Sequence, residues 1–279
     1  MLDVRFPLEK FSKYNDAVAI GLLFFNDVVP GVDFNTNQIA ISAAYHKALD
    51  LNNTQYISVG FQGGINQRNV NFEDLTFDDE FNGTTGFFNP SREVLPANNF
   101  SFGDWAVGIN YAFIPDRRTS FYAGLSLHHI FEPQIAFFPT DTDIMYEGNF
   151  LFRRFGAQVS ASVPLTEKYS IQPRVVANVQ GPHIQAITGS NLRISLSEYD
   201  YSAFHLGSWV RPVRNVDDSV SLDALIMMVG FEYRNILFGF SYDITLTDVQ
   251  NTRGRQGAFE FSVSYSSNTQ NESLLCPKF

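Results

Sequence analysis

Histidine, serine and acidic side chains are the groups that could give this chain a catalytic or metal site. His128 and His129 are neighbours on a predicted strand, so we expect their side chains to face opposite sides and not to share a metal. The other histidines, His46, His183 and His205, stand near no serine elbow of the kind a barrel lipase would need. No glycine-rich loop follows a strand and opens a helix, as a nucleotide site requires. The sequence therefore predicts no catalytic residue, no metal and no cofactor.

The stretch 67–103 combines an acidic run, Glu73 to Glu80, with several phenylalanines. Calcium takes several oxygen ligands, but this run does not have the spacing of an EF-hand, and a solvated loop is the better interpretation. A structureless loop of this length is uncommon, so we expect the stretch to fold. It would act either as a plug or cap over the lumen of a barrel or as a surface for a partner. The phenylalanines that point to these roles are Phe72, Phe77, Phe81, Phe87 and Phe88.

A second group of charged residues falls on predicted strands, on the face that carries small and polar side chains. Such charges could line a pore. Because a buried charge without water or a partner is costly, we favour structural pairing with one another or with an inserted loop. The residues are Arg174, Arg193, Glu232, Asp243 and Glu260.

The element that positions two of these charges is a predicted hairpin between residues 237 and 266. Apolar and small or polar residues alternate in both of its arms, which indicates β-strands with two different faces. We expect the apolar face to contact lipid, with Phe240, Tyr242, Phe259, Phe261 and Val263. We expect the other face to line a lumen, with Gly239, Ser241, Asp243, Glu260 and Ser262.

The composition favours a membrane barrel over other classes. The chain has 279 residues, of which 15% are aromatic, with 28 Phe and 12 Tyr. Its mean hydropathy is −0.09, and no run approaches the roughly 20 apolar residues of a spanning helix. The net charge of −10 argues against a nucleic-acid partner. Cys276 is the single cysteine, so no internal disulfide can form.

Period-two alternation predicts about thirteen strands along the chain. Most are longer than the usual soluble strand of about 5–6 residues and match the roughly 9–11 residues that cross a bilayer. The sequence thus predicts an all-β, antiparallel, up-and-down transmembrane barrel as a single domain, residues 1–266. The strands are expected near 2–8, 17–25, 36–48, 54–66, 104–114, 119–131, 151–163, 168–178, 183–196, 202–211, 220–233, 235–246 and 257–266.

The connections between these strands alternate between short and long, as in outer-membrane barrels with short periplasmic turns and longer outer loops. The link 180–182 is short where a long loop is expected. If the tail 267–279 is periplasmic, the loop 247–256 lies outside the cell. The predicted long connections are 26–35, 67–103, 132–150 and 247–256.

The beginning of the chain does not fit a complete barrel. Bacterial single-chain barrels have even strand numbers, and residues 1–10 show no apolar region of a signal peptide. We expect about 14 strands in the complete protein, with a signal peptide and one strand upstream of residue 1.

Several stretches, taken together and in order, resemble the PorP/SprF family of outer-membrane proteins of the type IX secretion system in Bacteroidota. The resemblance spans nearly the whole chain, although the signal peptide, the Asn-Pro-Ala-Tyr-like stretch and the first strand of the family are missing. The stretches are AIGLLFFND (19–27), TNQIAISAAYHKAL (36–49), ISVGFQGGINQRNVNFEDLTFDDEFNG (57–83), QGPH (180–183), DALIMMVGFEYRN (223–235), FGFSYDIT (238–245), GRQGAFEFSVSY (254–265) and CPKF (276–279).

The resemblance implies an integral outer-membrane barrel without enzymatic activity. Such a protein would support export or surface retention of type IX cargo, including large adhesins in gliding bacteria, together with other components of the system. Two rivals remain open from the residues. A diffusion channel for small solutes would have an open, hydrated lumen. A soluble adhesin or lectin sandwich would purify without detergent, and the strand lengths and the sorting of short and long loops argue against it.

Overall fold

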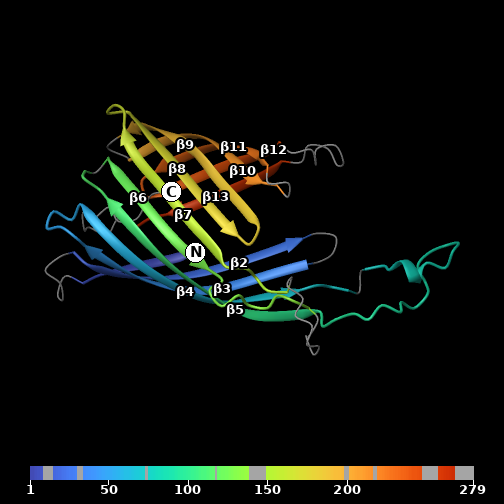
Figure 1. Cartoon of the computed structure of the whole chain (residues 1–279). Helices are drawn as coiled ribbons and strands as arrows, with labels where there is room; N and C mark the ends of the chain where they lie inside the picture. The colour runs from blue at the N-terminus through green and yellow to red at the C-terminus, as the bar shows by residue number, and fades with distance from the viewer. Residues whose placement is uncertain are drawn as a thin grey trace.

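A single antiparallel sheet of thirteen strands makes up the computed structural model (Figure 1). The structure describes residues 1–8, 15–29, 34–72, 75–116, 118–137, 149–197, 201–215, 219–246 and 257–267. All thirteen strands predicted from the alternation are present. They are β1 Leu2–Pro7, β2 Ala17–Val29, β3 Phe34–Ala48, β4 Gln55–Asn69, β5 Asn99–Phe113, β6 Ser120–His128, β7 Arg154–Pro164, β8 Tyr169–Gln180, β9 His183–Ser197, β10 Ser202–Arg214, β11 Val220–Tyr233, β12 Ile236–Thr245 and β13 Ala258–Tyr265.

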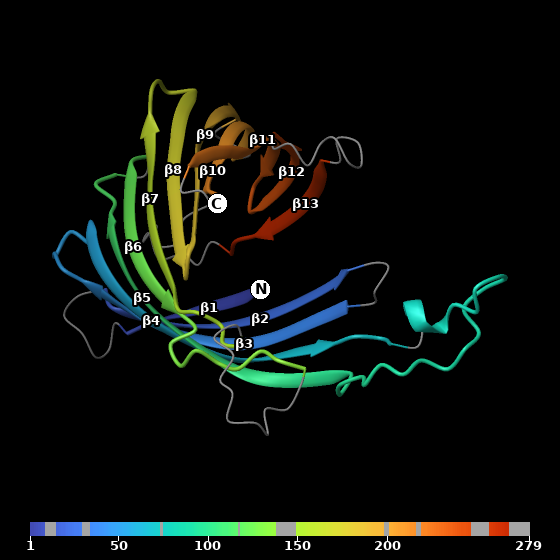
Figure 2. The same cartoon turned by 45° about the vertical axis from the view of Figure 1, so that its right-hand side comes forward.

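Each strand pairs with its neighbours in sequence, so the topology is up-and-down from β1 to β13. The sheet curls around a concave side (Figure 2). β1 pairs with β2 and β13 pairs with β12, and the described residues give no pairing between β1 and β13. The all-β, up-and-down prediction is confirmed, with a sheet that is curved like a barrel but not closed. In the described residues, no helix is long and apolar enough to cross a membrane.

The two faces of the sheet differ as the alternation requires. On the convex outer face, large apolar side chains are exposed along every strand, for example Phe240 at 47% and Phe261 at 56%. These two residues are cross-strand partners with ring centroids 4.9 Å apart. On the concave inner face, Gly239 pairs with Ser262, and Asp243 bonds to a side chain of β10. The hairpin therefore has its apolar residues outside and its polar residues inside.

The sheet has two ends with different connections. At the turn end the links are 8–16, 49–54, 114–119, 165–168, 198–201 and 234–235. At the loop end they are 30–33, 70–98, 129–153, 181–182, 215–219 and 246–257. The predicted long loop 26–35 is wrong, because β2 and β3 continue to Val29 and Phe34 and leave four residues between them. Length sorting is therefore weaker than predicted. The loop 247–256 and the tail after residue 267 lie outside the described residues.

Side chains on the inner face pack together at the turn end. A buried cluster joins β3 to β6 through Ala48, Tyr56, Ala112, Ile114 and Tyr122. These residues follow the pairing register, since Ala48 opposes Tyr56 and Ala112 opposes both Tyr56 and Tyr122. The cluster gives this part of the inner face an apolar floor.

A buried carboxylate stands beside this floor, just before β2. Asp16 is 2% exposed and accepts hydrogen bonds from Lys47 Nζ at 2.8 Å, from Tyr45 Oη at 2.8 Å and from the backbone N–H of Ala48 at 3.0 Å. A buried charge persists when it is paired and hydrogen-bonded in this way. The contact fixes Asp16, which precedes β2, to β3.

Candidate functional site

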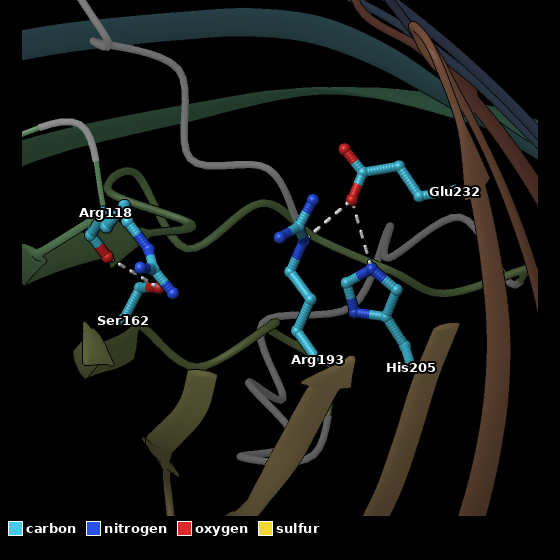
Figure 3. A network of polar contacts seen from close by, with 5 residues as sticks. All are labelled: Arg118, Ser162, Arg193, His205 and Glu232. Carbon is cyan, nitrogen blue, oxygen red and sulfur yellow. Dashed lines mark hydrogen bonds and ion pairs between the residues drawn. The ribbon is translucent and has the colours of Figure 1, made fainter. Parts of the chain in front are cut away.

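Two of the predicted charges meet on the inner face near the turn end. Arg193 on β9 lies with its Nε 3.0 Å from Glu232 Oε2 on β11, and His205 Nε2 on β10 lies 3.3 Å from the same oxygen (Figure 3). Glu232 is 5% exposed. The three residues come from adjacent strands whose register places Arg193 opposite His205. The sequence did not predict that His205 would complete this network.

A second ion network stands at the opposite, loop end of the same strands. Arg211 on β10 donates from Nε to Asp223 and from Nη2 to Asp243, both at 2.8 Å. The register shifts between Arg211 and Pro212, where Asp223 is the extra residue of β11. That bulge brings Asp223 to Arg211. Neither residue was among the candidates, since alternation alone assigns Asp223 to the other face.

The remaining predicted charges lie apart from these networks. Glu260 on β13 is exposed and accepts a hydrogen bond from Ser241 Oγ at 3.4 Å. Arg174 on β8 is half-buried and stands between Ser160 and Gly189 in the register. At the turn end, Arg118 donates to the backbone carbonyl of Glu167 at 2.8 Å and accepts from Ser162 Oγ at 3.4 Å, which ties two turns together (Figure 3).

The expectation that His128 and His129 face opposite sides is wrong. β6 ends at His128, and His129 follows with φ of +56°, a left-handed conformation that turns its side chain back. The two ring centroids are 6.3 Å apart, and His129 Nδ1 lies 2.9 Å from Asp104 Oδ2 on β5. In the described residues, no group of three or more His, Cys, Asp or Glu side chains could hold a metal ion.

The five candidate phenylalanines belong to one long connection, residues 70–98, which we call the arm. Its described part extends beyond the ends of β4 and β5, past the end of the sheet (Figure 2). It contains a short 3-10 helix, η1 Asp78–Glu80, and a bridge between Phe81 and Phe87. Phe72 and Phe77 are half-buried, whereas Phe81, Phe87 and Phe88 are 46%, 47% and 77% exposed. Glu73 and Asp74 lie outside the described residues.

A different loop contacts the inner face at the loop end. Phe137, from the connection 129–153, meets Phe100 edge-on with ring centroids 4.7 Å apart and meets Phe34 at 6.3 Å. Phe100 also stacks on Phe102 at 6.0 Å, and the Arg68 guanidinium stands 5.6 Å from the Phe102 ring. Phe137 is an aromatic contact that the sequence did not predict, because periodicity carries no information about a loop.

A comparison with known protein families identifies the family of this chain. The family described as type IX secretion system membrane protein PorP/SprF matches residues 1–265. The chain belongs to the PorP/SprF family. No curated protein matches the chain.

Membership explains why this PorP/SprF protein has apolar residues on its convex face. Exposed apolar side chains on one face and strands of this length are features of membrane proteins that cross a bilayer with β-strands. The general role of this PorP/SprF protein is that of a membrane component of the type IX secretion system.

Proposed function

We propose that this protein is a non-enzymatic, integral outer-membrane component that supports export or surface retention of type IX cargo such as large adhesins. The family match over residues 1–265 is the observation that carries the proposal. The exposed apolar outer face and the inward ion networks support placement in a bilayer. Other type IX components and the secreted cargo would be its protein partners.

The connections at the two ends of the sheet support one orientation in the membrane. In outer-membrane barrels the short turns are periplasmic and the longer loops are extracellular. Five of the six links at the turn end have six residues or fewer, whereas the loop end carries the arm. We therefore place the arm outside the cell, where it can reach cargo.

The arm is suited to dock a protein because its apolar groups are exposed on a locally ordered turn. Asn82 Oδ1 accepts from the backbone N–H groups of Thr84 and Thr85 at 3.0 and 2.9 Å, which closes the turn between Phe81 and Phe87. Those two rings stand 5.3 Å apart. Contiguous exposed apolar groups of this kind usually mark contacts with a partner. Its course past the ends of the strands (Figure 2) supports a partner surface more than a plug.

The test is to replace Phe81, Phe87 and Phe88 together by Ser in the full-length protein. The matched control is Phe131→Ser, which removes a similarly exposed phenylalanine, 73% exposed, from the other long loop. The triple variant should keep its membrane level and its heat-modifiable band on gels, yet lose cargo from the cell surface. Cargo display equal to that of the control would contradict the role of the arm.

The alternative function is a diffusion channel for small solutes. The polar side chains of Asn110, Gln158 and Asn178, on the inner face between the turn end and the loop end, favour this function. The apolar floor of Tyr56, Ile114 and Tyr122 at the turn end argues against a wide path. Purified protein in planar bilayers should show little steady conductance, and large, stable porin-like currents would favour the channel instead.

A further inference from the structure

A concave groove lies on the inner face at mid-height, between the aromatic contacts of the loop end and the apolar floor. It has a volume of about 490 Å³ and is lined from β3 across to β8. Pockets of roughly 300–1,000 Å³ are the usual size for ligand sites. We call it the amide groove, because Asn110, Gln158 and Asn178 line it.

Glycines give the groove its depth. Two rows of paired residues cross the strands here. The first row is Ala44, Gly60, Gly108, Ser126, Gly156 and Asn178, and the second is His46, Ser58, Asn110, Gly124 and Gln158. A Cβ on Gly124 would stand 2.9 Å from Asn110 Oδ1 and 3.2 Å from Gln158 Nε2. The neighbouring amides thus lie over the glycine, flat against the wall.

The three amides are not used by the protein itself. Within the described residues, the side chains of Asn110, Gln158 and Asn178 have no hydrogen-bond partner, and Asn110 Oδ1 is buried without one. His46 differs, since its Nδ1 lies 2.7 Å from Ser58 Oγ. A side-chain amide offers both donors and an acceptor. Leaving a buried polar atom unpaired is costly, so a ligand that donates a hydrogen bond to Asn110 Oδ1 removes that cost, while Gln158 is exposed and open to a ligand.

The charge around the groove restricts the ligand. Among the described residues that line it, none is a carboxylate. Arg154 and Arg174 lie on the same face, each two positions along its strand from the lining residues Gly156 and Val176. Lysine-rich ligands are therefore disfavoured, whereas neutral or acidic ones are not.

We propose that the amide groove holds an extended polypeptide segment of small polar residues, neutral or acidic in charge. Peptide groups present the same donor and acceptor pair as the lining amides. The Gly and Ala residues of the lining leave room for small side chains. A sugar would favour an exposed aromatic face, and the tyrosine of the lining, Tyr122, is 9% exposed. Six strands at about 4.8 Å spacing span roughly 24 Å, the length of about seven extended residues. The inference rests on the proposed function, since it names a polypeptide as the ligand.

The experiment uses full-length protein in detergent and a blocked, neutral heptapeptide of Ser, Asn and Gly. The central residue of the peptide is a leucine analogue that bears a diazirine for photo-crosslinking. Mass spectrometry maps the adducts. We expect adducts on the inner face of β4 to β8. Unlabelled heptapeptide should compete for them, and a peptide with Lys in place of Asn should compete at least tenfold less well.

Two variants test the site against a matched control. Gly60→Leu adds a side chain in the groove, where a Cβ would meet its nearest atoms at 3.7 Å, and it should reduce the adduct at least fivefold. The control is Gly103→Leu, because Gly103 pairs with Ile65, whose side chain points outward, and a Cβ there would meet its nearest atoms at 3.9 Å. It should leave the yield of the adduct unchanged. Asn178→Ala should reduce the yield without adding volume, so it decides the matter if Gly60→Leu does not fold.

An unchanged yield in folded Gly60→Leu and in Asn178→Ala would overturn the proposal. Competition by maltoheptaose, with none by the unlabelled peptide, would replace it with a sugar site. Cargo display in cells is measured separately. If cargo display is normal and is lost in a strain lacking the protein, yet no adduct forms on the inner face, the proposed ligand of the groove is refuted and the proposed function is not. Cargo display that persists in a strain lacking the protein would refute the proposed function.

Discussion

Replacing Glu232 by Leu should reveal how strongly the inner network stabilises the sheet. The carboxylate is 7% exposed and contacts Arg193 and His205. Breaking a buried ion pair costs about 3–5 kcal/mol, because one charge is left uncompensated. Arg193 is 27% exposed, so water reaches it in part and we expect the lower end of this range, about 3 kcal/mol. A tenfold change in the unfolding equilibrium corresponds to about 1.4 kcal/mol.

The same reasoning predicts that the double variant Arg193→Met, Glu232→Leu is more stable than the single one. Replacing both partners by apolar groups removes the unpaired charge and is often close to neutral. Urea unfolding in lipid vesicles, followed by tryptophan fluorescence, measures both. Trp209 is on β10 with His205, and its Nε1 donates to Asn191 Oδ1 at 3.0 Å, so it reports on this region.

Glu260→Gln provides the control for the loss of a carboxylate. Glu260 is exposed on β13 and its carboxylate accepts a long hydrogen bond from Ser241. The substitution should therefore change the free energy of unfolding by no more than about 0.5 kcal/mol. The reasoning would be refuted if Glu232→Leu cost no more than Glu260→Gln, or if the double variant were less stable than Glu232→Leu alone.

Three further predictions concern the wall and two turns. Phe261→Arg should cost about 2–4 kcal/mol if that residue lies near mid-bilayer, whereas Ser262→Arg should cost much less; vesicle unfolding of both distinguishes the faces. The backbone N–H of Arg118 lowers the pKa of Asp116, so the stability that this carboxylate adds is present above about pH 4 and is lost as the pH falls through its lowered value; unfolding of Asp116→Asn should lack that pH dependence. Gly181→Val should lower the unfolding midpoint more than Gly103→Val, because Gly181 has φ of +54° and a Cβ there would lie 2.8 Å from the Phe152 ring.

The strands were predictable because exposed apolar side chains on one face and packed or polar groups on the other give the sequence a period of two. The alternation becomes unclear near the loop end of β2 and of β5. Asn26 and Asp27 belong to β2, and Asn99 begins β5, yet all three resemble loop residues. In water both faces of a strand accept polar side chains, so the pattern that marks a strand is lost there.

The inner networks could be predicted only in part. Arg193 and Glu232 follow from alternation, but their contact depends on the register of three strands. Asp223 was missed because a bulge moves it, and the contact of His129 with Asp104 depends on a left-handed residue. Both are local departures from regular backbone, and sequence periodicity does not record them.

The strictly sequential pairing of the strands has a consequence for folding. Every strand pairs with its neighbours along the chain, so each hairpin can form without waiting for a distant segment. Closing a loop costs more entropy as its length increases, which favours hairpins with two-residue links, such as β8–β9 and β11–β12, as early structures. The β4–β5 pair must close the whole arm and should form late. The part of the protein that carries the exposed phenylalanines is therefore joined to one of the pairs of strands that we expect to form late.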